Sequence, residues 1–172
     1  MKRCPAGAAA LLAALTLVAC GGDSEPTETP APQASPATLA KANAICEDFL
    51  RQTKKLGAGA LENPPASILT LTTERLIKPS IPLLEAAARR MQALEPAANS
   101  SLFDLYADLY DPAIVLAEKR LEAGRAGDQN ESKRLENALD SIGREQRQAA
   151  RLLGLDNCDV DFQSVLLASL TE

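Results

Sequence analysis

Histidine and tryptophan are both absent from this 172-residue sequence, and aromatic residues make up only 3% of it. Without histidine the chain cannot build a Ser-His-Asp triad, a zinc site with imidazole ligands or a histidine proton relay. Three phenylalanines and two tyrosines offer little surface on which a sugar could stack. No glycine-rich phosphate-binding loop occurs in the sequence. Alanine and leucine dominate the apolar residues, which favours helices packed on helices over a β-sandwich.

The N-terminal residues have the features of a secretory signal. Lys2 and Arg3 are followed by an uncharged, mostly Ala and Leu stretch at 6–19. This stretch of about fourteen residues suits the apolar core of a signal peptide and is too short to cross a ~30 Å hydrocarbon layer. We therefore expect a cleaved signal, not a retained transmembrane anchor.

The apolar stretch ends at Leu17-Val18-Ala19-Cys20, which resembles the lipobox of bacterial lipoproteins. The resemblance implies that the Cys20 thiol receives a diacylglyceryl group, that residues 1–19 are removed, and that Cys20 becomes a new N-terminus that can also be N-acylated. Two acyl chains anchor a protein stably where one would be marginal. No other cofactor is expected. An ordinary signal peptide with an incidental cysteine is the alternative.

The remaining cysteines are an even pair. Cys4 would leave with the signal and Cys20 would carry lipid, so Cys46 and Cys158 remain. In an oxidising compartment such a pair predicts a disulfide. A zinc site would lack further soft ligands, and a cysteine nucleophile would lack its usual histidine partner.

Residues 20–36 predict a disordered tether that carries the lipidated cysteine, because the segment is rich in proline and threonine and lacks large apolar side chains. Residues 37–172 predict the folded domain. Removal of Lys2 and Arg3 leaves 16 basic and 23 acidic residues, a net charge of −7. An acidic module is a poor candidate for nucleic acid or for an anionic lipid surface, so the lipid would hold it at the membrane.

Apolar spacing predicts four main helices. The first begins at Ser35 and Pro36 and ends at Gly57 or Gly59; the second covers 66–94; the third runs from a cap at Asn99 or Ser100 to about 125 and contains Pro112; the fourth runs from a cap at Asp128 to Gly154. Residues 160–170 predict a short closing helix. The fourth helix has a core seam of coiled-coil type: Leu135, Leu139, Ile142, Gln146, Ala149 and Leu153.

These elements predict an all-α, up-down four-helix bundle. A chain reversal after Gly154 would bring Cys158 beside Cys46, so the disulfide would pin the bundle. Pro79 and Pro82 predict either a kink in the second helix or two separate helices. A bend could open a cavity; a simple corner is the favoured interpretation. Tyr106 and Tyr110 form an aromatic stripe with Phe103, which predicts core and, as an alternative, the lining of a pocket.

A candidate partner surface combines three aspartates on the third helix with three arginines on the fourth, at helical spacing: Asp104, Asp108, Asp111, Arg144, Arg147 and Arg151. An antiparallel hairpin would place them in register as an ion-pair ladder. The arginines lie away from the apolar seam, so a solvated ridge or a contact for an anionic envelope polymer are alternatives. A metal site on the aspartates is a further one.

The lipobox, the tether and the segments "ANAICEDF" and "AARLLGLDNC" together resemble small helical lipoproteins of high-GC actinobacteria, a resemblance that implies no activity. We expect a lipid-anchored protein on the extracytoplasmic face of the cell membrane. Gly21 after the lipidated cysteine would permit outer-membrane sorting in a cell with two membranes. A binding or adaptor module for an envelope protein or polymer is the leading hypothesis. A carboxylate-based envelope hydrolase and binding of a small apolar ligand between the helices are alternatives.

Overall fold

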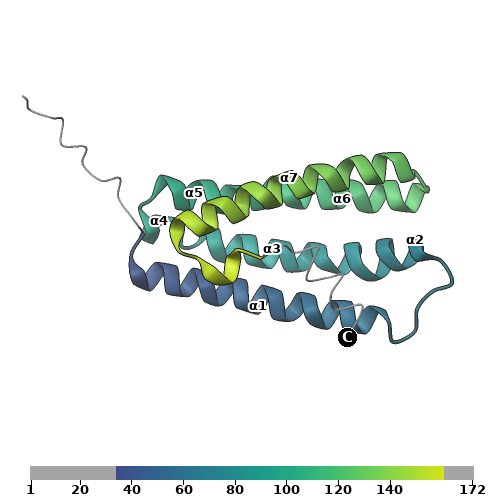
Figure 1. The fold of residues 1–172 in the computed structure, drawn as a ribbon, viewed down its shortest axis with the longest axis horizontal. Helices are drawn as coiled ribbons and strands as arrows, with labels where there is room; N and C mark the ends of the chain where they lie inside the picture. The colour runs from purple at the N-terminus through teal and green to yellow at the C-terminus, as the bar shows by residue number, and fades with distance from the viewer. Residues whose placement is uncertain (1–33, 161–172) are drawn as a thin grey trace, which may run out of the picture.

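The computed structural model describes residues 34–160. The signal, the lipobox with Cys20, almost all of the predicted tether and all but the first residue of the predicted closing helix lie outside these residues. Within them every regular element is helical and no strand occurs. Figure 1 shows an elongated bundle made of two antiparallel pairs: α1 (Pro36–Ala60) beside α3 (Lys78–Gln92), and α6 (Tyr110–Ala126) beside α7 (Gln129–Leu153). The predicted four-helix bundle is confirmed.

Helix α1 begins as its sequence predicts but ends later. The Ser35 hydroxyl accepts a hydrogen bond from the Thr38 backbone N–H at 3.1 Å, and Pro36 takes the first helical position. The helix continues through Gly57 and Gly59 to Ala60, so the prediction that glycine ends it was wrong. Gly57 and Ala60 are buried, and this packing outweighs the modest helix penalty of glycine.

The second helical region is continuous from α2 (Ile68–Thr70) through η1 (Leu71–Ile77) to the end of α3. Segment η1 is π-helical, and the Lys78 N–H donates to the carbonyl of Thr73, five residues back. The wider turn directly precedes Pro79, the first of the two prolines that remove a backbone donor. The prolines therefore change the hydrogen-bond register without dividing the helix in two.

The third predicted helix is interrupted. A single turn, α4 (Glu95–Ala98), leads to Ser100, which caps α5 (Ser101–Asp108) by accepting from the Phe103 N–H at 3.4 Å. Leu109 then separates α5 from α6. Pro112 is the cause, since it cannot donate to the carbonyl of Asp108 four residues earlier. The prediction of one unbroken helix was wrong at this point.

Helix α7 begins and ends at the capping residues that the sequence predicts. The Asp128 carboxylate accepts from the Glu131 N–H at 2.9 Å, and Gly154 ends the helix with a φ of 71°. The chain then reverses into η2 (Asp156–Cys158), which lies against α1. There the Asn157 N–H donates to Asn43 Oδ1 at 3.1 Å.

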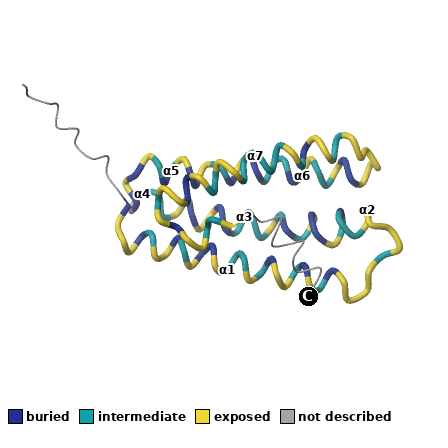
Figure 2. Tube along the Cα trace, viewed as in Figure 1, coloured by how far each residue is buried: buried dark blue, intermediate teal, exposed yellow. Residues whose placement is uncertain are grey.

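The hydrophobic core is divided unequally along the bundle. The larger cluster joins the first half of α1, the second half of α3, α5 and the end of α7, and includes Met91, Phe103 and Tyr106. The smaller one consists of Ala60 and Leu76, with Leu56 and Leu71 packed against them. Figure 2 shows buried positions on the inward faces of the helices and an exposed loop before α2. The end of the bundle near that loop therefore has the thinner core.

Candidate functional site

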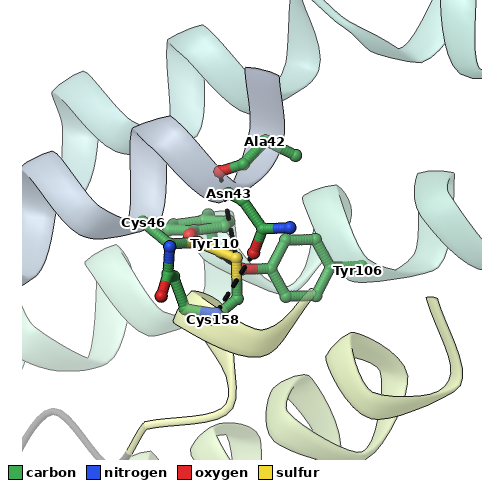
Figure 3. The surroundings of a disulfide bond; sticks show 7 residues. Ala42, Asn43, Cys46, Tyr106, Tyr110 and Cys158 are labelled. Carbon is green, nitrogen blue, oxygen red and sulfur yellow. Dashed lines mark hydrogen bonds between the residues drawn. A yellow bond between two sulfur atoms is a disulfide. The ribbon is translucent and has the colours of Figure 1, made fainter. Parts of the chain in front are cut away.

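The predicted disulfide is confirmed. Cys46 on α1 and Cys158 in η2 are bonded, with their Cα atoms 5.2 Å apart. A disulfide sulfur carries no hydrogen, so the Tyr106 hydroxyl must donate to Cys46 Sγ across 3.3 Å. Tyr110 in turn donates to Tyr106 Oη at 3.2 Å. Figure 3 shows both rings beside the sulfur atoms.

The two tyrosines belong to the core. Burial is the main cause that raises the pKa of both hydroxyls above the ordinary value. Phe103, Tyr106 and Tyr110 are all less than 5% exposed, and none of them lines the groove described next. The aromatic stripe is therefore a core feature, as the first of its two interpretations held.

An apolar groove of about 330 Å³ lies between the α2–η1–α3 run and the α6–α7 pair. We call this region the groove. Helix α7 contributes Leu139 and Ile142, which the sequence assigns to the core seam but which are only half-buried. The remaining apolar wall comes from the facing helices: Ile68, Leu71, Leu76, Ile77, Leu84, Ala113 and Ala117.

The polar side of the groove is dominated by one ion-pair group. Arg120 forms an ion pair with Glu136, with Nη2 and Oε2 3.3 Å apart, and the side chain of Arg120 is only 15% exposed. Lys133 approaches the same carboxylate at 3.4 Å. Gln146 and Arg147 also line this wall. Arg120 Nε and Gln146 Nε2 are buried and have no acceptor within residues 34–160, so the polar wall holds more donors than its own acceptors satisfy.

A hydrolase would need carboxylates on both sides of the bond that it cleaves. The groove does contain two acids, Glu136 and Asp140. Both project from α7, one turn apart, so they belong to the same wall. Glu136 is also held by two cations. This arrangement suits a charged rim better than an acid–base pair.

Two residues of the candidate partner surface contact partners other than those predicted. Arg151, predicted to pair with Asp104, donates instead to Asp159 at 2.8 Å. Asp111, predicted to pair with Arg144, accepts from Gln92 Nε2 at 3.1 Å. These two steps of the ion-pair ladder were wrong, because α5 and α6 turn their aspartates toward α3 and α4.

The three aspartates instead influence the pKa of Glu95, the first residue of α4. Desolvation raises the pKa of Glu95, and the negative charges of Asp108, Asp104 and Asp111 raise it further. Across residues 34–160, no three side chains of the metal-binding types are grouped so that they could hold an ion. Arg147 lines the groove, and Arg144 is exposed on α7. A docking role for this surface stays a prediction.

Sequence reasoning did not locate the groove. It noted that a bend near Pro79 and Pro82 could open a cavity, and the π-helical segment before these prolines does contribute to the groove wall. The seam on α7 gave no further signal, because a groove-lining leucine and a core leucine follow the same helical spacing.

Within the described part of the chain, no helix combines the length and the hydropathy needed to cross a membrane. Comparison of the chain with protein-family models, with curated proteins and with solved structures finds no match.

Proposed function

We propose that this chain is an extracytoplasmic binding module, anchored by lipid at Cys20, which takes the apolar chain of a small amphiphile into the groove. The groove is the observation that carries the binding role. Its volume of about 330 Å³ is at the lower end of the range for small-molecule sites, and its lining is apolar with a few polar groups at one wall, as in such sites.

The polar wall favours a ligand whose head group bears oxygen acceptors. Arg120 Nε and Gln146 Nε2 are buried donors with no acceptor within residues 34–160. A carboxylate or phosphate head would add the acceptors that this wall lacks, while the alkyl chain would cover the leucines and isoleucines of the facing helices. A fully apolar ligand would leave these donors without partners, at a cost of about 1–3 kcal/mol for each one that it buries.

The proposed location rests on the N-terminal sequence. The L-V-A-C motif at 17–20 and the proline-rich sequence that follows it are typical of a lipidated cysteine followed by a spacer. The Cys46–Cys158 disulfide supports the same location, because such bonds persist mainly outside the cytosol. A stalk would let the groove reach a ligand or an envelope partner at a distance from the membrane.

Binding is tested with 11-(dansylamino)undecanoic acid, a fluorescent fatty acid. We expect saturable binding by the purified protein and a loss of about tenfold or more in Leu139→Gln, because the amide would be buried against the alkyl chain at roughly 1–3 kcal/mol. Leu152→Gln is the matched control: Leu152 also lies on α7, is 68% exposed and does not line the groove. Equal affinity in the two variants, or no saturable binding by the wild type, contradicts the proposal.

The anchor is tested by mass spectrometry of the native protein. We expect a first residue Cys20 that bears acyl mass, and a Cys20→Ser variant that retains its signal segment and lacks the lipid. An unmodified Cys20, or a mature chain that still begins at Met1, rules out the lipoprotein assignment. The groove result would stand independently of that outcome.

A further inference from the structure

We propose that the groove selects a fatty acid that carries a second oxygen near the far end of its alkyl chain. Arg120 binds the carboxylate, and Gln146 binds the second oxygen as a hydroxyl group. The proposal rests on the proposed function, since it concerns the ligand of the same groove. It adds a polar position that a plain fatty acid would leave unfilled.

The two unpartnered donors of the groove lie at different levels of the bundle. Arg120 Nε and Gln146 Nε2 are both buried without an acceptor within residues 34–160. The guanidinium of Arg120 is at the level of Glu136, because its Nη2 lies 3.3 Å from Oε2 of that residue. Gln146 follows Glu136 by ten residues on α7, which is about 15 Å along the helix axis at ~1.5 Å per residue. Side chains on one helix lean in the same direction, so the two donors are on the order of 10–15 Å apart.

One head group cannot satisfy both donors, because the oxygens of a carboxylate or phosphate are much closer together than this. A plain fatty acid bound at Arg120 would lay its alkyl chain against Gln146 and leave Nε2 buried without a partner, which opposes binding. A second oxygen on the chain removes this penalty. An extended chain of ~1.52 Å C–C bonds advances about 1.25 Å per bond, so that oxygen belongs about 8–12 bonds from the carboxyl carbon.

The chemistry of the two donors decides which oxygen each one takes. Arg120 is a cation, and a hydrogen bond between a guanidinium and a carboxylate is stronger than one between neutral groups. Gln146 offers an uncharged amide. Its neighbours on the groove wall, Asp140 and Arg147, carry opposite charges. An uncharged hydroxyl oxygen therefore suits the Gln146 level, and the carboxylate suits the Arg120 level.

The position of the two levels in the bundle agrees with this assignment. Arg125, near the end of α6, pairs with Glu74 of η1 at 2.7 Å, so the Arg120 level lies toward η1 and the preceding α2. Figure 1 shows α2 at the opposite end of the bundle from α5, and Ile68 of α2 lines the groove while it is 82% exposed. The Gln146 level lies toward the larger core, to which the end of α7 belongs. The charged head therefore stays near the exposed end, and the alkyl chain extends toward the larger core.

Displacement of 11-(dansylamino)undecanoic acid by unlabelled competitors tests the second oxygen. The competitors are 12-hydroxydodecanoic acid and its isomer 3-hydroxydodecanoic acid, which have the same composition. We expect the 12-hydroxy acid to bind wild type about threefold more tightly or better, because only its hydroxyl reaches Gln146. Equal affinities of the two isomers, or tighter binding of the 3-hydroxy acid, overturn the proposal.

A variant of the amide assigns the effect to one side chain. Gln146→Leu removes the donor and should abolish the preference for the 12-hydroxy acid. Gln148→Leu is the matched control, because Gln148 also lies on α7, is exposed and does not line the groove, and it should keep the preference. A preference that persists in Gln146→Leu, or disappears equally in both variants, overturns the proposal.

The carboxylate position is tested with dodecanoic acid and 1-dodecanol as competitors at pH 7. Wild type should prefer the acid, and Arg120→Gln should lose most of this preference, whereas Arg144→Gln, which changes an exposed arginine of α7 outside the groove, should keep it. An unchanged preference in Arg120→Gln overturns the assignment of the head group. If the dansyl probe shows no saturable binding to wild type, the proposed function fails together with this proposal. If the probe binds and the competitors displace it without the expected preferences, only this proposal fails.

Discussion

Loss of the disulfide should remove a large part of the stability of the bundle. Cys46 and Cys158 are separated by 112 positions in the sequence, so the bond closes a loop that includes most of the described domain. For a loop of that length the chain-entropy model gives about 5 kcal/mol of stabilisation, through restriction of the unfolded chain. Domains of this size are typically stable by only ~5–15 kcal/mol in total.

Two perturbations distinguish the stability contributed by the crosslink from the stability contributed by its buried sulfur atoms. Reduction with dithiothreitol keeps both sulfur atoms, so Tyr106 can still donate to Cys46 Sγ. The Cys46→Ala/Cys158→Ala variant removes this acceptor as well, and Cys46 is only 4% exposed. We therefore expect the alanine pair to lose about 1–3 kcal/mol more than reduction alone, as a buried hydroxyl is left with fewer partners.

The measurement is urea unfolding of a Cys20→Ser chain that begins at residue 20, followed by far-UV circular dichroism in oxidised and reduced form. We expect the midpoint to fall by the equivalent of about 4–5 kcal/mol on reduction, with the alanine pair lower still. A change of less than about 1 kcal/mol would refute the reasoning, because it would mean that the unfolded chain is not measurably restricted by this crosslink. Tyr106→Phe in the oxidised protein is the control for the hydroxyl alone.

Two further predictions concern the other end of the bundle. Gly124→Ala should destabilise the protein by about 1–3 kcal/mol in urea unfolding, because the new Cβ would clash with Oγ1 of the buried Thr73, although Gly→Ala in a helix normally stabilises it. The added change Thr73→Ala should restore most of the loss, and a neutral Gly124→Ala would contradict the prediction. Glu74→Gln should lower the Tm at pH 7 and have a much smaller effect near pH 2, because hydrogen bonds from Arg125, above all, and Lys78 lower the pKa of Glu74 from 4.5 to about 2. A folded-state pKa below the unfolded one gives stability that is complete above pH 4.5 and is lost as the pH falls toward 2, so an equal Tm difference at both pH values would count against it.

The parts of the fold that sequence predicts are those set by local chemistry. Ser35, Asp128 and Gly154 mark helix ends where the structure has them, because a cap depends on a few neighbouring residues and their backbone geometry. The disulfide was predictable for a different reason. Only two cysteines remain once Cys4 and Cys20 are assigned to the signal and the lipid, and the up-down order of the helices brings those two together.

The wrong predictions concern helix boundaries and side-chain pairs that depend on packing between helices distant in the sequence. Gly57 does not end α1, because its burial makes a glycine acceptable there. Pro112 does not merely bend the third helix; it separates α5 from α6 at Leu109. The Asp–Arg ladder was predicted from residue numbering about the turn between the two helices. That numbering does not determine how far each helix is rotated about its axis. Arg151 therefore met Asp159 instead.

The groove also depends on how each helix is rotated about its axis, and it involves the same apolar face of α7 as the larger core. Helix α7 uses Ala149 and Ala150 in the large core near the disulfide, whereas Leu139 and Ile142, farther along the same seam, line the groove. One periodic apolar face therefore serves two purposes, because the helices that oppose it differ along its length. The disulfide belongs to the well-packed end, yet its Cys158 also lines the groove. The crosslink that stabilises the larger core therefore also holds one residue of the groove wall in place.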